Sequence, residues 1–285
     1  MSWLLFCLKT SRPGLWFPTL WLYTLPLAGQ SPWSEVAFWV GLLYVTFPLN
    51  FLVYGWNDMV DQETDRLNPR KDTYLFGAKG SDDQLKRLPL SIFLVQVLCY
   101  PLLVFYGGWK ILLVALGIAL FCWIYNAQEW GFRGVPPLEL LCQVGYLLVL
   151  PLSCLLNDVS LPSWDVWLYL FLFCTQSQLM GEVMDIKPDR EAGRETSATK
   201  LGRVGTKFVV IGVVLAETAL VWFHFDDSVF GAGLGVFLLW LLLDIFVIYA
   251  NTEYTIRDFK IFGIGSNLVA LFSMIYVWQS QLFIS

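Results

Sequence analysis

Residues 36–65 read VAFWVGLLYVTFPLNFLVYGWNDMVDQETD, an apolar run that passes directly into a cluster of acidic side chains. Because a helix needs roughly 20 apolar residues to cross the hydrocarbon core of a bilayer, residues 36–56 predict a transmembrane helix. The acidic cluster begins where this helix would leave the membrane. If the helix continues, Asn57, Asp61 and Asp65 are spaced i, i+4 and i+8 and form one face of oxygen ligands, next to Asp58.

Eight further apolar stretches of comparable length occur along the chain. The 285 residues are 57% hydrophobic and only 14% charged, which is too apolar for a soluble domain of this size. We therefore predict an all-α integral membrane protein, a bundle of about nine transmembrane helices around a central cavity, in a single domain over residues 1–285. The expected spans are residues 15–29, 36–56, 90–106, 111–126, 138–156, 166–182, 208–225, 229–250 and 261–283.

The basic residues indicate the orientation of these helices. Of the 18 Lys and Arg residues, all except Lys110 fall on one side of the membrane when nine spans are assigned. Since Lys and Arg gather on the cytoplasmic side, the N-terminus and both acidic clusters are expected to be cytoplasmic. A signal peptide cleaved near Ala28 and Gly29 would leave eight spans, an alternative that the charge pattern also permits.

A second acidic cluster ends the sixth predicted span. It reads EVMDIKPDREAG over residues 182–193, and places Glu182, Asp185 and Asp189 at i, i+3 and i+7 on one helix face. Pro188 lies inside this cluster, where the missing backbone donor is expected to kink the helix and to displace Asp189. The two clusters thus repeat one design on the same side of the membrane.

Carboxylates packed this closely repel one another unless cations neutralise them. Mg²⁺ is the expected cation, because it is usually held by one or two carboxylates together with substrate phosphates. Basic residues beside the clusters would contact the phosphate oxygens of a bridging diphosphate; they are Arg66, Arg70, Lys71, Arg190 and Arg194. The six cysteines lack CxxC spacing and His224 is the only histidine, so a Cys or His metal site is not expected. The alternative is that acidic helix ends only solvate the membrane boundary.

The paired clusters resemble the two motifs of the UbiA superfamily of intramembrane prenyltransferases. The resemblance covers essentially the whole chain and implies an enzyme that moves a prenyl group from an allylic prenyl diphosphate to a hydrophobic acceptor in the bilayer, with no nucleic-acid partner. It implies that Mg²⁺ and the diphosphate are held by Asn57, Asp58, Asp61, Asp65, Glu182, Asp185 and Asp189. Tyr125 matches a tyrosine that the family tends to place at the end of the fourth helix, and Arg133 stands in for a basic residue of the following loop.

The acceptor is indicated by two shorter sequences. Ser11-Arg12-Pro13 and Asn68-Pro69-Arg70-Lys71 are similar to members of the superfamily that prenylate carotenoids, such as lycopene elongases. Quinone, chlorophyll or lipid acceptors stay open. A terpene cyclase using the same diphosphate site is a second hypothesis, and a carrier that binds without chemistry is a third.

Polar residues inside the predicted spans are costly and therefore informative. We expect Gln143, Gln176 and Gln178 to form hydrogen bonds between helices, Glu217 and Asp244 to face each other, and Glu139 to contact the acceptor. Outside the spans, Ser81 with Asp82 and Asp83 predicts the start of a short helix on the membrane surface.

Overall fold

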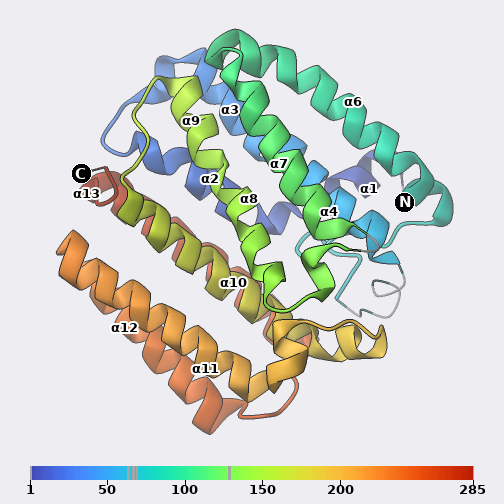
Figure 1. Cartoon of the computed structure of the whole chain (residues 1–285), viewed down its shortest axis with the longest axis vertical. Helices are drawn as coiled ribbons and strands as arrows, with labels where there is room; N and C mark the ends of the chain where they lie inside the picture. Colours follow the sequence, from blue (N-terminus) through green and yellow to red (C-terminus); the bar gives the residue numbers. More distant parts are fainter. Residues whose placement is uncertain (1, 63–64, 66–67, 69, 128–129, 285) are drawn as a thin grey trace.

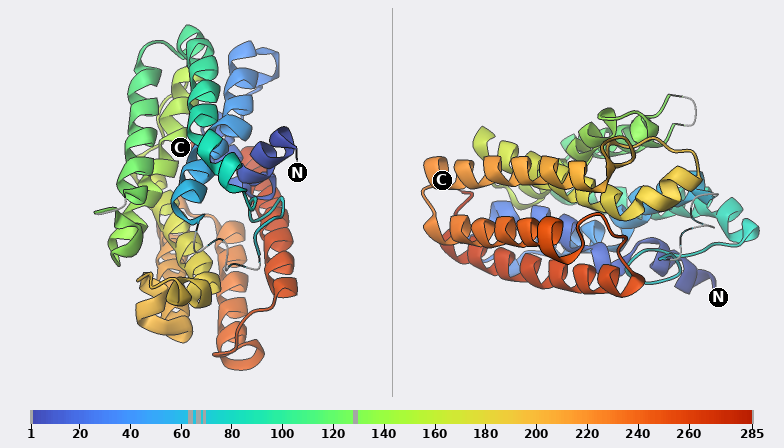
Figure 2. Two further views of the ribbon diagram at one scale, coloured as in Figure 1. Left: turned by 90° about the vertical axis from the view of Figure 1, so that its right-hand side faces the viewer. Right: turned by 90° about the horizontal axis from the view of Figure 1, so that it is seen from below.

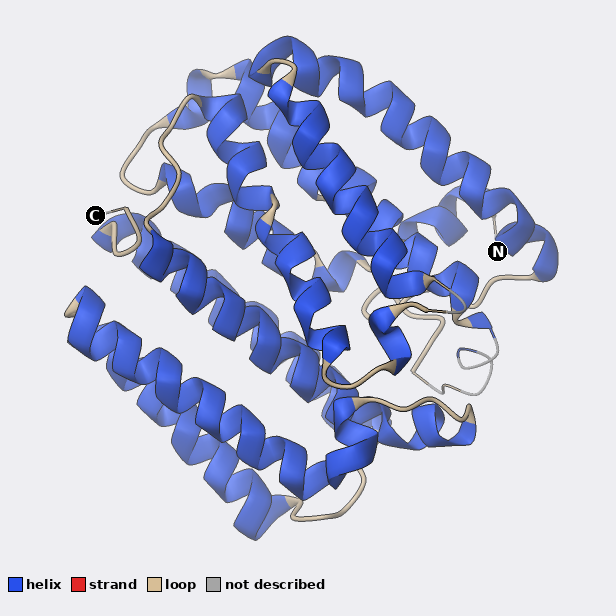
Figure 3. Cartoon of the chain, viewed as in Figure 1, coloured by secondary structure: helices blue, strands red, loops and turns tan. Residues whose placement is uncertain are grey.

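Helices form most of the described chain, and they run alongside one another as a bundle (Figures 1 and 2). The computed structural model describes residues 2–62, 65, 68, 70–127 and 130–284, and no β-strand occurs within these residues (Figure 3). The N-terminus lies near the end of the bundle that carries the connection between α4 and α6, and the C-terminus lies at the opposite end. The all-α prediction is therefore confirmed.

The N-terminal half contributes α-helices of very different length. They are α1 (Trp3–Thr10), α2 (Phe17–Thr24), α3 (Val36–Val45), α4 (Phe47–Val60), α6 (Asp82–Gly107) and α7 (Lys110–Asn126). Short 3₁₀ turns flank α2 at Pro13–Leu15 and Leu25–Leu27. The large side chains of the main core, including Phe6, Tyr23 and Phe51, are almost completely buried in this half.

The C-terminal half begins with short helical pieces and continues with four long helices. The pieces are the 3₁₀ helix η5 (Leu138–Gln143), α8 (Val144–Leu147) and α9 (Val149–Asn157), and the long helices are α10 (Trp164–Glu191), α11 (Ser197–Leu220), α12 (Ser228–Leu243) and α13 (Ile256–Ser280). One π-helical turn extends α11 over Val221–Phe225, and another extends α12 over Asp244–Ile248. Of all helix pairs, α10 and α11 pack together most extensively.

Six helical segments in the described residues are long and apolar enough to cross a bilayer, so the chain is a multi-pass integral membrane protein. They are Val36–Val60, Asp82–Gly107, Leu138–Asn157, Ser197–Phe225, Ser228–Ile248 and Ile256–Ser280. A seventh apolar helix, Lys110–Asn126, is shorter. The longest helix, α10, coincides with the sixth predicted span, but Gln176 and Gln178 lower its apolar character.

Two sequence-based expectations about helix continuity are wrong. The first predicted span, residues 15–29, is interrupted: α2 begins beside Pro18, and a 3₁₀ turn containing Pro26 follows it, because proline lacks the amide donor that an α-helix needs. The surface helix predicted at Ser81 begins there with a capping box, but it does not stop. It continues through Pro89 into the next span and forms the single helix α6.

The second predicted span is divided at Thr46, where α3 ends and α4 begins. The backbone of Thr46 is not helical, so carbonyl groups near the break need additional partners, although that of Thr46 still accepts the N–H of Asn50 (3.3 Å). The buried side-chain amide of Asn50 donates to the carbonyls of Val45 (2.9 Å) and Thr46 (2.7 Å). A break at membrane depth is tolerated because protein groups satisfy the freed carbonyls, and α4 can then point its C-terminal end in its own direction.

The glutamine prediction holds, because Gln143 of η5 donates to Gln178 of α10 (2.8 Å) and Gln176 donates to Glu217 of α11 (3.0 Å). The expected contact between Glu139 and the acceptor stays a prediction, and the structure shows a second role for this residue. Its buried carboxylate accepts the backbone N–H of Ser197 (2.7 Å), at the first turn of α11, where an anion is favoured by the unsatisfied amides and the helix dipole.

Glu217 and Asp244 do not face each other, contrary to the sequence-based expectation. Asp244 instead forms an ion pair with Lys207 of α11 (2.5 Å), and both side chains are buried. Lys207 immediately precedes the predicted span at residues 208–225, but α11 begins ten residues earlier at Ser197. Lys207 is therefore inside the helix, where a buried carboxylate is the partner that compensates its charge.

Candidate active site

The first acidic motif lies at the C-terminal end of α4, where basic side chains surround it. Asp58 is only 4% exposed and accepts from Arg12 (2.8 Å) and Lys71 (2.7 Å). Lys71 also forms an ion pair with Asp65 (2.7 Å), so one ammonium group joins two carboxylates of the motif. Helix α4 ends at Val60, and the N–H of Asp61 still donates to the carbonyl of Asn57 (2.9 Å). The one-turn spacing predicted between these two residues is therefore present.

Arg12 belongs to this site, although it was not among the site residues predicted from the sequence and was used only for the orientation of the chain and for the similarity of Ser11-Arg12-Pro13 to carotenoid-prenylating relatives. It lies between α1 and the first 3₁₀ turn, in a left-handed backbone conformation (φ 51°) just before Pro13. Its guanidinium also lies over the ring of Tyr54 on α4, 4.4 Å from the ring centre. A basic residue next to the start of a span, on the same side as the acidic motifs, was the available sequence signal.

The second motif occupies the last turns of α10. The helix continues through Pro188 to Glu191, and Asp189 is buried within the site, so the predicted displacement of Asp189 is wrong. Pro188 cannot donate to the carbonyl of Met184, one turn earlier, yet α10 continues past it to Glu191. Asp185 accepts from Arg70 and from the amide of Asn68 (3.4 Å), both from the connection that follows α4.

The chain turns back sharply after α10, and this turn positions Arg194. Gly193 has φ +69°, the left-handed conformation that glycine adopts at little cost. The N–H of Arg194 donates to the carbonyl of Asp189 (2.8 Å) and the N–H of Gly193 to that of Arg190 (3.1 Å), which is a Schellman motif. The turn places the Arg194 side chain over the carboxylate that ends the motif.

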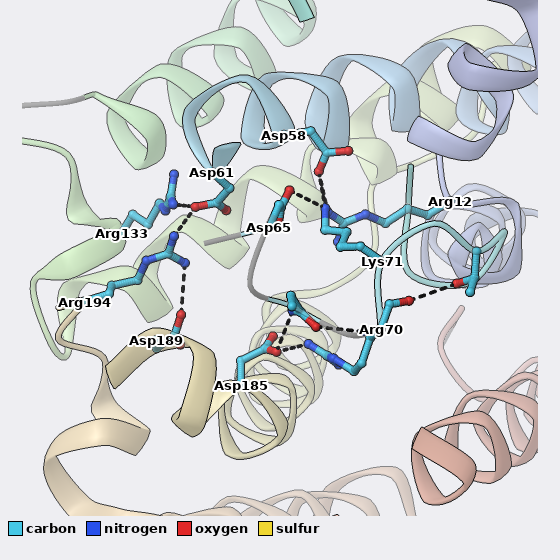
Figure 4. Close-up of polar contacts among 12 residues, drawn as sticks. Arg12, Asp58, Asp61, Asp65, Arg70, Lys71, Arg133, Asp185, Asp189 and Arg194 are labelled. Atoms are coloured by element: carbon cyan, nitrogen blue, oxygen red, sulfur yellow. Dashed lines mark hydrogen bonds and ion pairs between the residues drawn. The ribbon is translucent and has the colours of Figure 1, made fainter. Parts of the chain in front are cut away.

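Arg194 joins the two motifs, as Figure 4 shows. Its guanidinium forms an ion pair with Asp189 of the second motif (3.3 Å) and another with Asp61 of the first. Arg133, from the 3₁₀ turn Phe132–Gly134 after α7, also forms an ion pair with Asp61. The two acidic motifs, more than a hundred residues apart, thus face one another across shared guanidinium groups.

Glu182 is engaged differently from the other acidic residues of the second motif. Its carboxylate is 5% exposed, and it accepts from the side chain of Gln178 (3.1 Å) and from the backbone N–H of Ala198 (3.3 Å). One oxygen therefore bonds within α10, and the other connects α10 to the first turn of α11. A ligand role for Glu182 stays a prediction.

The remaining candidates divide into two groups. Asn57 and Tyr125 are partly buried near the C-terminal ends of α4 and α7, and Tyr125 lies within electrostatic range of Arg194. Arg190 is exposed and donates to the carbonyl of Thr199 (3.2 Å), so the structure does not bring it to the motifs. Arg66 lies outside the described residues.

Burial and like charge raise the pKa of two carboxyl groups of the site, Asp189 and Asp65, and make them costly to ionise. Burial, together with the carboxylates of Asp185 and Glu182, raises the pKa of Asp189 to about 8. Burial also raises the pKa of Asp65, although the ammonium group of Lys71 opposes that shift. Nearby cations stabilise the ionised form of such groups. The sequence predicted that cations would neutralise these carboxylates.

The donor set fits Mg²⁺ bound together with a diphosphate. Within the described residues, no three Asp, Glu, His or Cys side chains gather closely enough to hold a metal by themselves. Mg²⁺ does not require such a cage, since one or two carboxylates and substrate phosphates usually suffice. Oδ2 of Asp58 is buried without a hydrogen-bond partner, and so are Nε of Arg12 and Nη1 of Arg133. The site therefore offers both a carboxylate oxygen for a cation and N–H donors for phosphate.

Comparison with solved structures supports the fold. A UbiA homolog from Archaeoglobus fulgidus bound to GPP and Mg²⁺ matches with a TM-score of 0.63 and 18% sequence identity, over 95% of this chain and 99% of that one. The same homolog bound to Cd²⁺ matches with a TM-score of 0.66 and 17% identity over the same shares. At this identity the likeness concerns the arrangement of helices.

Sequence comparison identifies the family. A lycopene elongase/hydratase of Corynebacterium glutamicum is 28% identical over 223 residues, 75% of each chain. Another from Haloarcula japonica is 26% identical over 246 residues, 81% of this chain and 78% of the relative. The sequence model of the UbiA prenyltransferase family matches residues 15–278, nearly the entire chain. The resemblance read from the two acidic motifs is thereby confirmed: this protein belongs to the UbiA prenyltransferase family and is a prenyltransferase.

Proposed function

We propose that this enzyme uses Mg²⁺ to transfer a prenyl group from an allylic prenyl diphosphate to a carotenoid-like polyene inside the membrane. The observation that carries the proposal is the position of Arg194 between Asp61 and Asp189, because it places both acidic motifs around one charged centre. Two carboxylate groups facing each other suit a diphosphate that needs a divalent cation on each side. The relatives named as lycopene elongases/hydratases favour the polyene acceptor.

The acidic residues would hold the metal, and the basic residues would hold the phosphates. Asp58, Asp61, Asp65, Asp185 and Asp189, with Asn57, would present the oxygen atoms for Mg²⁺. When bound, Mg²⁺ would act as a Lewis acid that stabilises the charge developing on the diphosphate leaving group. When Mg²⁺ and the diphosphate bind, the basic side chains that now pair with these carboxylates would bind phosphate oxygens instead. Guanidinium groups form strong bidentate contacts with phosphate. The basic side chains are Arg12, Arg70, Lys71, Arg133 and Arg194.

Charge and atoms balance over three bond changes. The bond between C1 of the prenyl group and the diphosphate oxygen breaks, and the electron pair leaves with pyrophosphate. A double bond of the acceptor then attacks the allylic cation and forms a carbon–carbon bond. The new cation on the acceptor loses a proton, which the released pyrophosphate anion can accept. Water must be kept away from the allylic cation until the acceptor attacks it. Aromatic side chains near the motifs, such as Tyr54 of α4, would stabilise this cation.

The membrane arrangement completes the proposal. Residues 1–285 would act as one catalytic unit of nine membrane segments, with the N-terminus and the site on the cytoplasmic side. The distribution of Lys and Arg supports this orientation. Soluble diphosphate head groups would then meet the site from the cytoplasm, while the apolar prenyl tail and acceptor stay within the bilayer.

Purified protein supplied with prenyl diphosphates, Mg²⁺ and candidate acceptors tests the proposal, with products measured by mass spectrometry. Asp61→Ala and Asp185→Ala should each lower Mg²⁺-dependent turnover by more than about 100-fold, while Asp83→Ala on the exposed first turn of α6 should leave it unchanged. Full activity in either motif variant refutes the assigned roles. Cyclised hydrocarbon formed without any acceptor would identify a terpene cyclase instead.

A further inference from the structure

Arg70 is held by more than its ion pair with Asp185. Its guanidinium lies between two aromatic rings, 5.0 Å from the ring centre of Phe76 and 4.9 Å from that of Phe259. The two rings are 6.5 Å apart and nearly perpendicular to each other. Arg70 itself is only 9% exposed. A planar cation between two rings is restricted in orientation as well as stabilised.

The two rings come from distant parts of the chain. Phe76 follows Arg70 in the same connection, where its backbone N–H donates to the side chain of Thr73 (3.0 Å). Phe259 lies in the first turn of α13, which begins at Ile256. The orientation of Arg70 above the second motif therefore depends on where α13 begins.

Phe259 is in turn supported by the buried ion pair of α11 and α12. Its ring lies 6.1 Å from that of Tyr254, whose hydroxyl donates to both oxygens of Asp244 (3.1 and 3.0 Å). Asp244 pairs with Lys207, and the Lys207 ammonium lies 4.8 Å from the Tyr254 ring centre. These contacts fix the segment that leads into α13. The buried ion pair between Lys207 and Asp244 therefore helps to position Phe259 next to Arg70.

A cavity next to Arg70 would allow its side chain to adopt other orientations if the two rings were absent. A cavity of about 350 Å³ is bordered by Arg70 and Phe259 together with Lys187, Arg203 and Tyr254. A flexible arginine beside such a cavity would turn into it whenever its partner moved. With the ring of Phe259 in place, the guanidinium stays directed at Asp185.

We propose that Phe259 is a positioning residue, which holds Arg70 in the orientation needed to bind the diphosphate of the donor. This inference rests on the proposed function, since it concerns how the same site binds a diphosphate. Phe259 itself would not touch the substrate. Removing the ring of Phe259 would weaken diphosphate binding, because ordering Arg70 on binding would then cost more conformational entropy.

Mg²⁺-dependent binding of inorganic pyrophosphate to the full-length protein in detergent, measured by calorimetry, tests this role. Phe259→Leu keeps an apolar side chain but removes the ring, and it should raise Kd roughly tenfold, equivalent to about 1.4 kcal/mol. Phe259→Tyr keeps the ring and should restore binding to within about twofold of the original protein. Phe262→Leu, one turn further along α13 and exposed, is the matched control and should change nothing.

Arg70 supplies the decisive comparison. In an Arg70→Ala background, Phe259→Leu should have no further effect on Kd, because its action requires the guanidinium. An equal loss in both backgrounds, or unchanged binding in Phe259→Leu, overturns the inference. If Phe259→Leu does not fold, Phe76→Leu applies the same test through the second ring. Protein that binds pyrophosphate with this dependence on Phe259, yet transfers no prenyl group, would contradict the proposed function alone.

Discussion

Replacing Asp58 by asparagine should destabilise the protein far more than the same change at Asp72. Both residues form ion pairs with a lysine, at 2.7 Å for Asp58 with Lys71 and 3.0 Å for Asp72 with Lys9. They differ in burial: the side chains of Asp58 and Lys71 are 4% and 5% exposed, whereas that of Asp72 is 56% exposed. Asparagine has nearly the same shape as aspartate, so the comparison isolates charge.

The size of the effect follows from what remains after the change. Asp58→Asn leaves Arg12 without the carboxylate at 2.8 Å, and it leaves Lys71 with Asp65 alone. Removing one partner of a buried ion pair typically costs about 3–5 kcal/mol, because the other charge stays buried and uncompensated. An exposed pair contributes about 0–1 kcal/mol, so Asp72→Asn should be nearly neutral.

Unfolding of both variants in detergent micelles, without Mg²⁺ or diphosphate, measures this difference directly. Omitting both ligands separates the stability of the ion pairs from binding at the site. Equal losses of unfolding free energy in the two variants would refute the reasoning, since burial would then not determine the energy. A loss in Asp58→Asn that vanished in an Arg12→Gln/Lys71→Gln background would support it.

Three other outcomes are expected. Lys207→Met should cost about 3–5 kcal/mol of unfolding free energy by leaving Asp244 buried and unpaired, and a second change, Asp244→Leu, should recover most of it; no recovery would count against the pair. Arg133→Leu should raise the KM for the donor about tenfold, whereas a similar rise in the exposed Arg190→Leu would contradict the assignment of Arg133, and not Arg190, to donor binding. Chelation of divalent cations should abolish prenyl transfer, and added Mg²⁺ should restore it; turnover in the presence of excess chelator would exclude the metal role.

Features that depend on neighbouring residues could be predicted well. The helical period puts Asp185 and Asp189 on one face whatever the rest of the chain does, and the Ser81 cap is formed by residues within one turn. Helix continuity was harder to predict. Proline interrupts the first predicted span but is accommodated within α6 and α10, because its cost depends on whether other groups satisfy the freed carbonyls.

The sequence by itself determined that this is a membrane-embedded helical protein with two acidic motifs, since apolar length and helical spacing are local properties of the chain. Only the tertiary structure decided which cation serves which carboxylate. Arg12 pairs with Asp58, Lys207 pairs with Asp244, and Phe259 packs against Arg70, although each pair comes from separate helices or connections. The physical reason is that desolvated charges must be neutralised by whatever group helix packing brings within a few ångströms, and the order of residues along the chain does not specify that group.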